Sequence, residues 1–270
     1  MPARFLCYRL RFLNMRKIKL LLEYEGTRYH GWQYQPRELS IQEVIEAKLE
    51  KITKKKTRLI GSGRTDSGVH AEGQVAHFMT ASTMKPREFL KALNSLLPHD
   101  IVVKKVEEAK PDFHAQKSAT RKTYRYTILN RDYPSALHCR MVHYMMTPLN
   151  VGAMRKAARY LVGKKDFKSF QGSGCTARTT VRQIFRLTIA KKDDFITITV
   201  DGSGFLKFMV RNIVGTLIEI GWGKWPPEQM QTILKSKNRR IAGPTAPSRG
   251  LRLVKVVYGK KSPRKKAKSP

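Results

Sequence analysis

Residues 57–80, TRLIGSGRTDSGVHAEGQVAHFMT, place a polar, glycine-rich loop between two short apolar segments. The flanking segments, 57–61 and 74–80, have the length and apolar content of strands. The three glycines of the loop permit backbone angles that other residues resist, so the chain can bend tightly there. We therefore predict a strand–loop–strand unit whose loop covers residues 61–71.

The segments on either side complete a βαββαβ order. A buried strand is predicted at 17–25 and a helix at 40–52, where Ser40 opens a capping-box pattern. A second helix is predicted at 86–97, beginning with a proline, and a strand follows at 101–106. This order predicts a ferredoxin-like arrangement of the α+β class, which RNA-recognition modules (RRM-like folds) also use.

The second half predicts a decorated copy of the same order, although no sequence repeat links the halves. We place the boundary near 108–117, between an N-terminal domain, 15–112, and a C-terminal α/β domain, 113–258. Strands are predicted at 119–129, 142–146, 183–190, 195–200 and 251–257, and helices at 151–162, 205–220 and 228–234.

Both ends of the chain are basic and are predicted to be disordered. Residues 1–14 form a leader without acidic residues, and residues 259–270 form a tail that is too highly charged to pack. The leader slightly resembles an organellar presequence, and Met15 is an alternative start. Both possibilities stay open.

The chain carries 54 Lys and Arg against 20 Asp and Glu, a net charge of +34. Nine of these charges lie in the two tails, which leaves +25 on residues 15–258. Mutual repulsion among so many cations favours a polyanionic partner, and nucleic acid fits best. An anionic membrane surface is the main alternative, but no apolar run approaches the roughly 20 residues that span a bilayer.

Cysteine and histidine patterns indicate neither a disulfide framework nor a metal site. The three cysteines, Cys7, Cys139 and Cys175, are widely separated, and no CxxC pair or HExxH helix occurs. This usage fits a reducing compartment. We expect a cytoplasmic protein, with organellar targeting by the leader left open.

One carboxylate, Asp66, stands inside the glycine-rich loop, with Arg64 two residues before it. An aspartate between glycines is usually a turn former. At an RNA site, however, a lone ionised carboxylate repels phosphate, so we expect Asp66 to have a chemical task. Such a group acts as a nucleophile or a general base. Because no partner carboxylate is evident, isomerisation at a ribose carbon is favoured over glycosidic hydrolysis.

Seven motifs occur in one order between about residue 17 and residue 258. They are YEGTRYHGWQ at 24–33, GRTDSGVHA at 63–71 followed by GQV at 73–75 and HF at 77–78, FHA at 113–115, SAT at 118–120 with YRY at 124–126, DF at 166–167, FMVRNIVG at 208–215 and GL at 250–251. In these motifs and their order the chain resembles the TruA-type tRNA pseudouridine synthases.

The resemblance implies roles for five side chains. Asp66 matches the catalytic nucleophile, and Arg211 matches the arginine that pairs with it, which is expected to lower the pKa of Asp66. Tyr124 matches the tyrosine that stacks on the target base, and Leu251 matches an apolar residue near that base. Arg64 is expected to contact the RNA backbone or to hold the extruded nucleotide. Ordinary alternatives stay open: a solvent-reaching Arg211, a strand aromatic at 124 and a core leucine at 251.

The resemblance also implies two ferredoxin-like halves with joined antiparallel sheets around a catalytic cleft, and a homodimer. It implies uridines at positions 38–40 of the tRNA anticodon stem-loop as substrates, without metal, ATP or another small-molecule cofactor. Attack at ribose C1′ or at base C6 stays open, as does the base that removes the C5 proton. The alternatives are a non-catalytic RNA-binding protein of the same fold and a synthase acting on other RNA sites.

Overall fold

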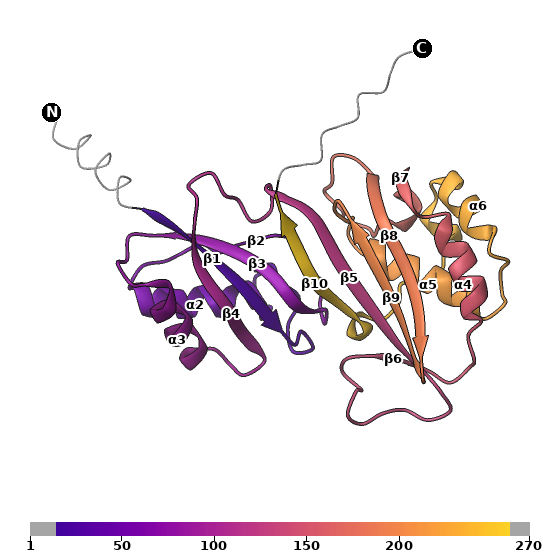
Figure 1. Cartoon of the computed structure of the whole chain (residues 1–270), viewed down its shortest axis with the longest axis horizontal. Coiled ribbons are helices and arrows are strands. Elements are labelled where there is room, and N and C mark those ends of the chain that lie inside the picture. The colour runs from indigo at the N-terminus through magenta and orange to yellow at the C-terminus, as the bar shows by residue number, and fades with distance from the viewer. Residues whose placement is uncertain (1–14, 260–270) are drawn as a thin grey trace, which may run out of the picture.

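The computed structural model describes residues 15–259 and contains a ten-stranded sheet that runs through both halves of the chain (Figure 1). The strands are Arg16–Tyr24 (β1), Ile60–Gly61 (β2), His70–Thr80 (β3), Ile101–Ala109 (β4), Ala119–Asn130 (β5), His143–Met145 (β6), Gly163–Asp166 (β7), Val181–Lys192 (β8), Phe195–Gly202 (β9) and Leu251–Tyr258 (β10). The helices are Ile41–Thr53 (α2), Pro86–Leu96 (α3), Val151–Arg159 (α4), Met209–Gly221 (α5) and Gln229–Ser236 (α6), and the 3-10 turns are Lys168–Phe170 (η1), Arg239–Ile241 (η2) and Ser248–Gly250 (η3).

The N-terminal half has the strand order β4-β1-β3, with the two-residue β2 paired to β3. Alternate residues of β1 are fully buried, because one face of the strand packs in the core and the other carries lysines. Helix α2 begins where Ser40 accepts a hydrogen bond from the backbone N–H of Glu43, at 3.3 Å, and α3 begins at Pro86. The predicted βαββαβ order is confirmed.

The C-terminal half repeats this arrangement with β10-β5-β9-β8 as its strand order. Strands β8 and β9 form the predicted hairpin, whose turn places Asp193 in a left-handed conformation (φ 51°). Helix α5 is buried along almost its whole length, and α4 packs against it. The α+β class and the two ferredoxin-like halves are thereby confirmed.

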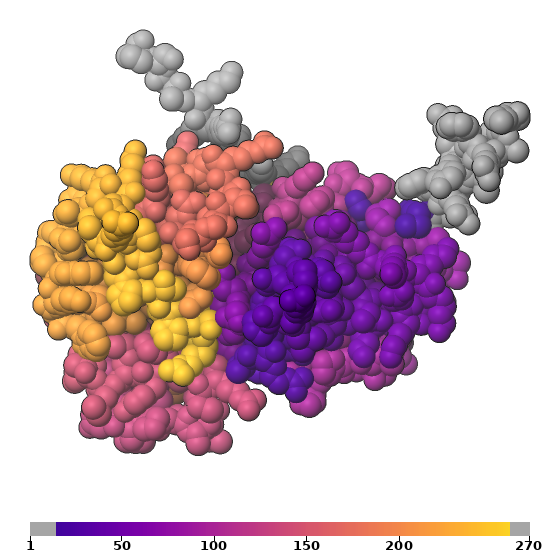
Figure 2. All heavy atoms as spheres, turned by 180° about the vertical axis from the view of Figure 1, so that it is seen from behind, coloured from indigo at the N-terminus to yellow at the C-terminus, as the bar shows by residue number. Residues whose placement is uncertain are grey.

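The last strand of the chain joins the two halves. β10 pairs antiparallel with β5, where Leu253 lies opposite Tyr124, and parallel with β3, where it lies opposite Ala71. The joined sheets are as expected, except that the junction itself is parallel. In Figure 2 the segment before β10 (yellow) reaches the surface of the N-terminal half (indigo). The loop after β2 also lies beside the C-terminal half, because the carbonyl oxygen of Ser62 accepts a hydrogen bond from Lys122 on β5.

Three expectations differ from the structure. The helix expected from residue 205 begins at Met209, because Phe208 adopts a left-handed backbone (φ 61°) that interrupts helical geometry. β7 was not predicted, because its sequence Gly-Lys-Lys-Asp carries no apolar pattern and the strand exists only by pairing with β8. β3 begins at His70, so the connecting loop ends at Val69.

Other predicted bounds differ by a few residues at element ends, as helix and strand ends often do. The boundary predicted near 108–117 begins in the last two residues of β4, lies otherwise between β4 and β5, and stays a prediction. The predicted disorder of residues 1–14 and 260–270 concerns parts of the chain outside the described residues.

Candidate active site

The loop that carries Asp66 is braced by the segment that follows β1. The backbone N–H of Trp32 donates to the carbonyl oxygen of Thr65 at 3.1 Å, and that of Gly68 donates to Tyr29 at 3.2 Å. Gly31 has φ +86°, and a Cβ on it would lie 2.5 Å from the carbonyl oxygen of Thr65. Only glycine lets the two segments approach this closely.

A network of buried polar side chains holds the loop that carries Asp66. The hydroxyls of Tyr24 and Thr65 are 2.9 Å apart, and Gln74 Nε2 donates to the carbonyl oxygen of Gly63 at 2.9 Å. Ser62 Oγ donates to Gln74 Oε1 at 2.7 Å. Burial raises the pKa of Tyr24 to about 12, so its hydroxyl stays protonated and able to donate at neutral pH. These bonds fix the backbone on both sides of Arg64.

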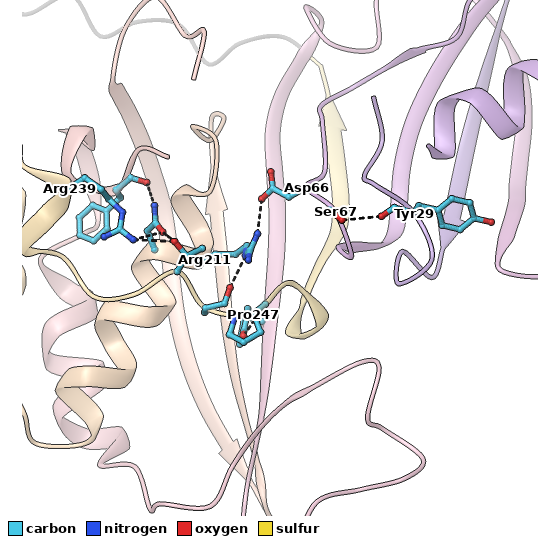
Figure 3. Close-up of polar contacts among 11 residues, drawn as sticks. Tyr29, Asp66, Ser67, Arg211, Arg239 and Pro247 are labelled. Atoms are coloured by element: carbon cyan, nitrogen blue, oxygen red, sulfur yellow. Dashed lines mark hydrogen bonds and ion pairs between the residues drawn. The ribbon is translucent and has the colours of Figure 1, made fainter. Parts of the chain in front are cut away.

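Asp66 meets Arg211 across the boundary between the halves. Arg211 Nη1 lies 3.5 Å from Asp66 Oδ2, and Figure 3 shows the two side chains pointing toward each other. Only 14% of the Arg211 side chain and 21% of the Asp66 side chain are exposed, so the pair is largely withdrawn from water. Arg211 Nε also donates to the carbonyl oxygen of Ala246 at 2.7 Å, which fixes the guanidinium. The predicted pairing is present.

Arg211 lowers the pKa of Asp66 as predicted, but the net direction of the pKa shift is opposite to the expected one. Burial, the largest influence, raises the pKa of Asp66 above the ordinary value for a carboxyl group, while the charges of Arg211 and Lys207 lower it only in part. Burial dominates because withdrawing a carboxylate from water disfavours its charged form. The carboxylate is therefore less solvated than a surface aspartate, which suits a nucleophile.

Tyr124 lies on β5 in the same electrostatic environment. Burial is the main influence that raises the pKa of its hydroxyl, and the charges of Tyr24 and Asp66 act in the same direction. Its ring packs edge-on against Phe205, with centroids 5.2 Å apart, and only 8% of the residue is exposed. The structure thus brings Tyr124 near Asp66. Such deep burial fits an ordinary strand aromatic as well as a stacking residue.

Leu251 and Arg64 lie at the margins of this group. Leu251 is buried at the start of β10, opposite Tyr126, whose hydroxyl donates to Pro247. Arg64 is exposed, and its Nε donates to Gln33 Oε1 at 3.2 Å. It borders a cavity of about 280 Å³ whose lining includes no carboxylate. The residues that line this cavity are Trp32, Gln33, Gln42, Arg58, Leu59, Ile60, Gly61, Gly63, Arg64, His114 and Gln116.

Two supporting features escaped sequence reasoning. His70 Nδ1 accepts from the backbone N–H of Gly26 at 2.9 Å, and its Nε2 lies 3.1 Å from the carbonyl oxygen of Arg249, so one imidazole links the halves. Burial lowers the pKa of His70, which favours its neutral form. The signal for the second feature was available: Gln74 is a polar residue inside an apolar strand pattern, and such a residue needs buried partners.

Residues 15–259 contain neither a metal-binding cluster nor a membrane-spanning helix. Within this range no group of three or more His, Cys, Asp or Glu side chains is arranged to hold a metal ion. None of the helices there combines the length and the apolar content needed to cross a membrane. What the site offers is one partly desolvated carboxylate that is paired with an arginine and lies near a buried tyrosine.

Known proteins similar to this chain agree with one another. A family model described as tRNA pseudouridine synthase matches residues 21–116 and 157–259. The tRNA pseudouridine synthase A of Thermoanaerobacter sp. (strain X514) is 46% identical over 90% of this chain and 100% of that protein. The Geobacter sulfurreducens protein of the same name is 49% identical over the same shares. A solved archaeal box H/ACA sRNP Nop10-Cbf5 complex aligns with a TM-score of 0.35, at 9% identity over 78% of this chain and 46% of that chain.

Proposed function

Because this chain belongs to the tRNA pseudouridine synthase family, whose members isomerise uridine in tRNA, we propose that Asp66 is the nucleophile of that reaction. The observation that carries the proposal is the Asp66–Arg211 pair, which sets one ionisable carboxylate where the two halves meet. A protein that only bound RNA would gain nothing from an anion at its RNA-facing surface. The +25 charge on residues 15–258 supplies attraction for the tRNA backbone.

In the proposed reaction, Asp66 attacks either C1′ of the ribose or C6 of the base. The C1′–N1 bond breaks and the uracil turns. C5 then bonds to C1′, and the bond that Asp66 formed, to C1′ or to C6, breaks and frees the carboxylate. The C5 proton leaves to a base, and N1 gains a proton, so the product is an isomer of the substrate. Arg211 keeps the carboxylate oriented and offsets part of the cost of its burial.

The substrate positions that we propose are uridines 38–40 of the anticodon stem-loop, by resemblance to the TruA-type enzymes. A uracil within a stem is stacked, so it must be extruded, at a cost of a few kcal/mol. Stacking on Tyr124 would offset about 1–3 kcal/mol of that cost. Leu251 would contact the extruded base, and Arg64, beside a cavity without carboxylates, would contact the RNA backbone.

The test is to incubate the protein with an unmodified tRNA transcript and to map pseudouridine along it. We expect pseudouridine at positions 38–40, and none after Asp66→Asn, while tRNA binding is retained. Modification at other positions would refute the proposed sites without affecting the role of Asp66. A fully active Asp66→Asn variant would refute the nucleophile.

We also propose that the protein is a homodimer, again by resemblance to the family. Sedimentation equilibrium of the protein alone at micromolar concentration is expected to give twice the mass of one chain. The mass of a single chain at all concentrations would contradict this proposal.

A further inference from the structure

Lys122 connects the C-terminal half to the loop that carries Asp66. It lies on β5, two residues before Tyr124, so the two side chains project from the same face of that strand. Its Nζ donates to the carbonyl oxygen of Ser62 at 2.6 Å, and Ser62 is itself fully buried at the start of the loop. One ammonium group thus holds the backbone of the other half.

The neighbouring residue, Gly63, leaves room for this contact because it has no side chain. A Cβ at position 63 would lie 2.7 Å from Lys122 Nζ, so it would push the flexible end of that side chain away from its contact with Ser62. The carbonyl oxygen of Gly63 is meanwhile held by Gln74 Nε2 at 2.9 Å. Hydrogen bonds from both halves, donated by Lys122 and Gln74, therefore hold the loop backbone immediately before Arg64.

Lys122 has no anionic partner within residues 15–259, since none of their ion pairs includes it. Burial lowers its pKa to about 8. Withdrawing an ammonium from water without a carboxylate costs free energy, and an apolar side chain would avoid that cost. What Lys122 gains in exchange is a charge-assisted hydrogen bond to the loop, which is stronger than a neutral one.

We propose that Lys122 is a positioning residue for the isomerisation, holding the backbone at Ser62 and Gly63 so that Asp66 is aimed into the site. This inference rests on the proposed role of Asp66. It makes a distinct claim, because it assigns part of the catalytic rate to a side chain that need not touch the tRNA.

The first test compares Lys122→Met with a matched control, Lys91→Met, an exposed lysine on α3. Single-turnover rates and tRNA dissociation constants are measured for both. Because misplacement of a reacting group by about 1 Å can cost roughly 100-fold, we expect Lys122→Met to lower the rate by about 10- to 100-fold, with tRNA affinity within about twofold of the unmutated protein. Lys122→Arg, which keeps a cation, is expected to recover part of the rate. Lys91→Met should change neither quantity.

The second test is a double-mutant cycle with Gly63→Ala. Alone, this substitution displaces the ammonium from its contact with Ser62 and should slow the reaction. In the Lys122→Met background the collision with the ammonium is relieved, so the second substitution should slow the reaction less than it does alone. Additive effects of the two substitutions would overturn the proposal. So would a Lys122→Met rate within about twofold of the unmutated rate, or a loss that lies wholly in tRNA affinity.

Failure of this inference is distinguishable from failure of the proposed nucleophile. An active Asp66→Asn variant removes the role of Asp66, whatever Lys122 does. An inactive Asp66→Asn variant together with a fully active Lys122→Met variant overturns only the positioning role. Should Lys122→Met fail to fold, Lys122→Leu replaces it, because leucine removes both the charge and the N–H donor. A rate equal to that of the unmutated protein would again overturn the proposal.

Discussion

At the scale of single residues, the raised pKa of Asp66 makes a prediction about stability. A carboxyl group whose pKa is higher in the folded than in the unfolded state adds stability at low pH, and this contribution is lost as pH rises through the folded pKa. Burial raises the pKa of Asp66, so its ionisation opposes folding near neutrality. We expect the change in unfolding free energy caused by Asp66→Asn to be more favourable at pH 7 than at pH 4. Urea unfolding of both proteins at both pH values measures this change. A difference of the opposite sign would contradict the direction of the shift.

The proposed role of Asp66 predicts how variants of its partner, Arg211, change the pH dependence of the reaction. Arg211 is the largest of the influences that lower the pKa of this carboxyl, so Arg211→Met should raise that pKa further. Because the nucleophile must be ionised, the acid limb of the single-turnover pH–rate profile should move to higher pH. Arg211→Lys retains a cation and should move it less. An acid limb that stays in place in both variants would show that Asp66 does not control it.

Sequence reasoning succeeded for residues whose neighbours lie within one motif or whose chemistry is unusual. Asp66 stands out as a carboxylate in a basic chain, and Arg211 as a cation in an apolar helix, and the structure pairs them. It failed for the direction of the pKa, because the extent of burial depends on both halves together. It also did not find Lys122, one of 54 basic residues, whose partner lies 60 positions away.

At the scale of elements, the contact between the segment after β1 and the loop that carries Asp66 predicts the effect of one glycine substitution. Gly31→Ala places a side chain at φ +86° and a Cβ 2.5 Å from Thr65. Gly223→Ala is the matched control, since its φ is +81° and its Cβ would meet nothing within 4 Å. The left-handed backbone alone costs about 1–2 kcal/mol, so both variants should lose about that much stability. Only Gly31→Ala should lose more and slow the reaction, as measured by urea unfolding and single-turnover assays. Equal losses in both variants would show that the close approach is unimportant.

Local sequence patterns predicted the types of the helices and strands. They did not predict several of the residues at which these elements begin or end, and they missed strand β7. Pro86 and Ser40 carry their own starting signals, and α3 and α2 begin where those signals place them. Helix α5 begins four residues later than its apolar pattern does, because the left-handed Phe208 is set by tertiary packing: a Cβ on Gly172 would lie 2.5 Å from its ring. β7 has no pattern of its own and forms only against β8.

At the scale of the whole molecule, charge determines how tRNA is held. Each phosphate that the protein neutralises releases counterions, so affinity falls with salt in proportion to the number of contacts. With +25 on residues 15–258, we expect a steep fall in tRNA affinity between low and physiological salt. Six to ten phosphate contacts would correspond to a loss of about 10³- to 10⁵-fold between 50 and 200 mM salt.

The position of Arg64 predicts that this one side chain contributes to the salt dependence of tRNA affinity. Arg64 is exposed and borders the cavity without carboxylates, so it is placed to meet one phosphate. Arg64→Gln should lower the slope of log affinity against log salt by about one and weaken binding similarly for different tRNAs. Arg159→Gln, at the exposed end of α4, removes the same charge outside the site and should leave the slope unchanged. If both variants lowered the slope equally, the effect would belong to the overall charge, and Arg64 would have no contact of its own.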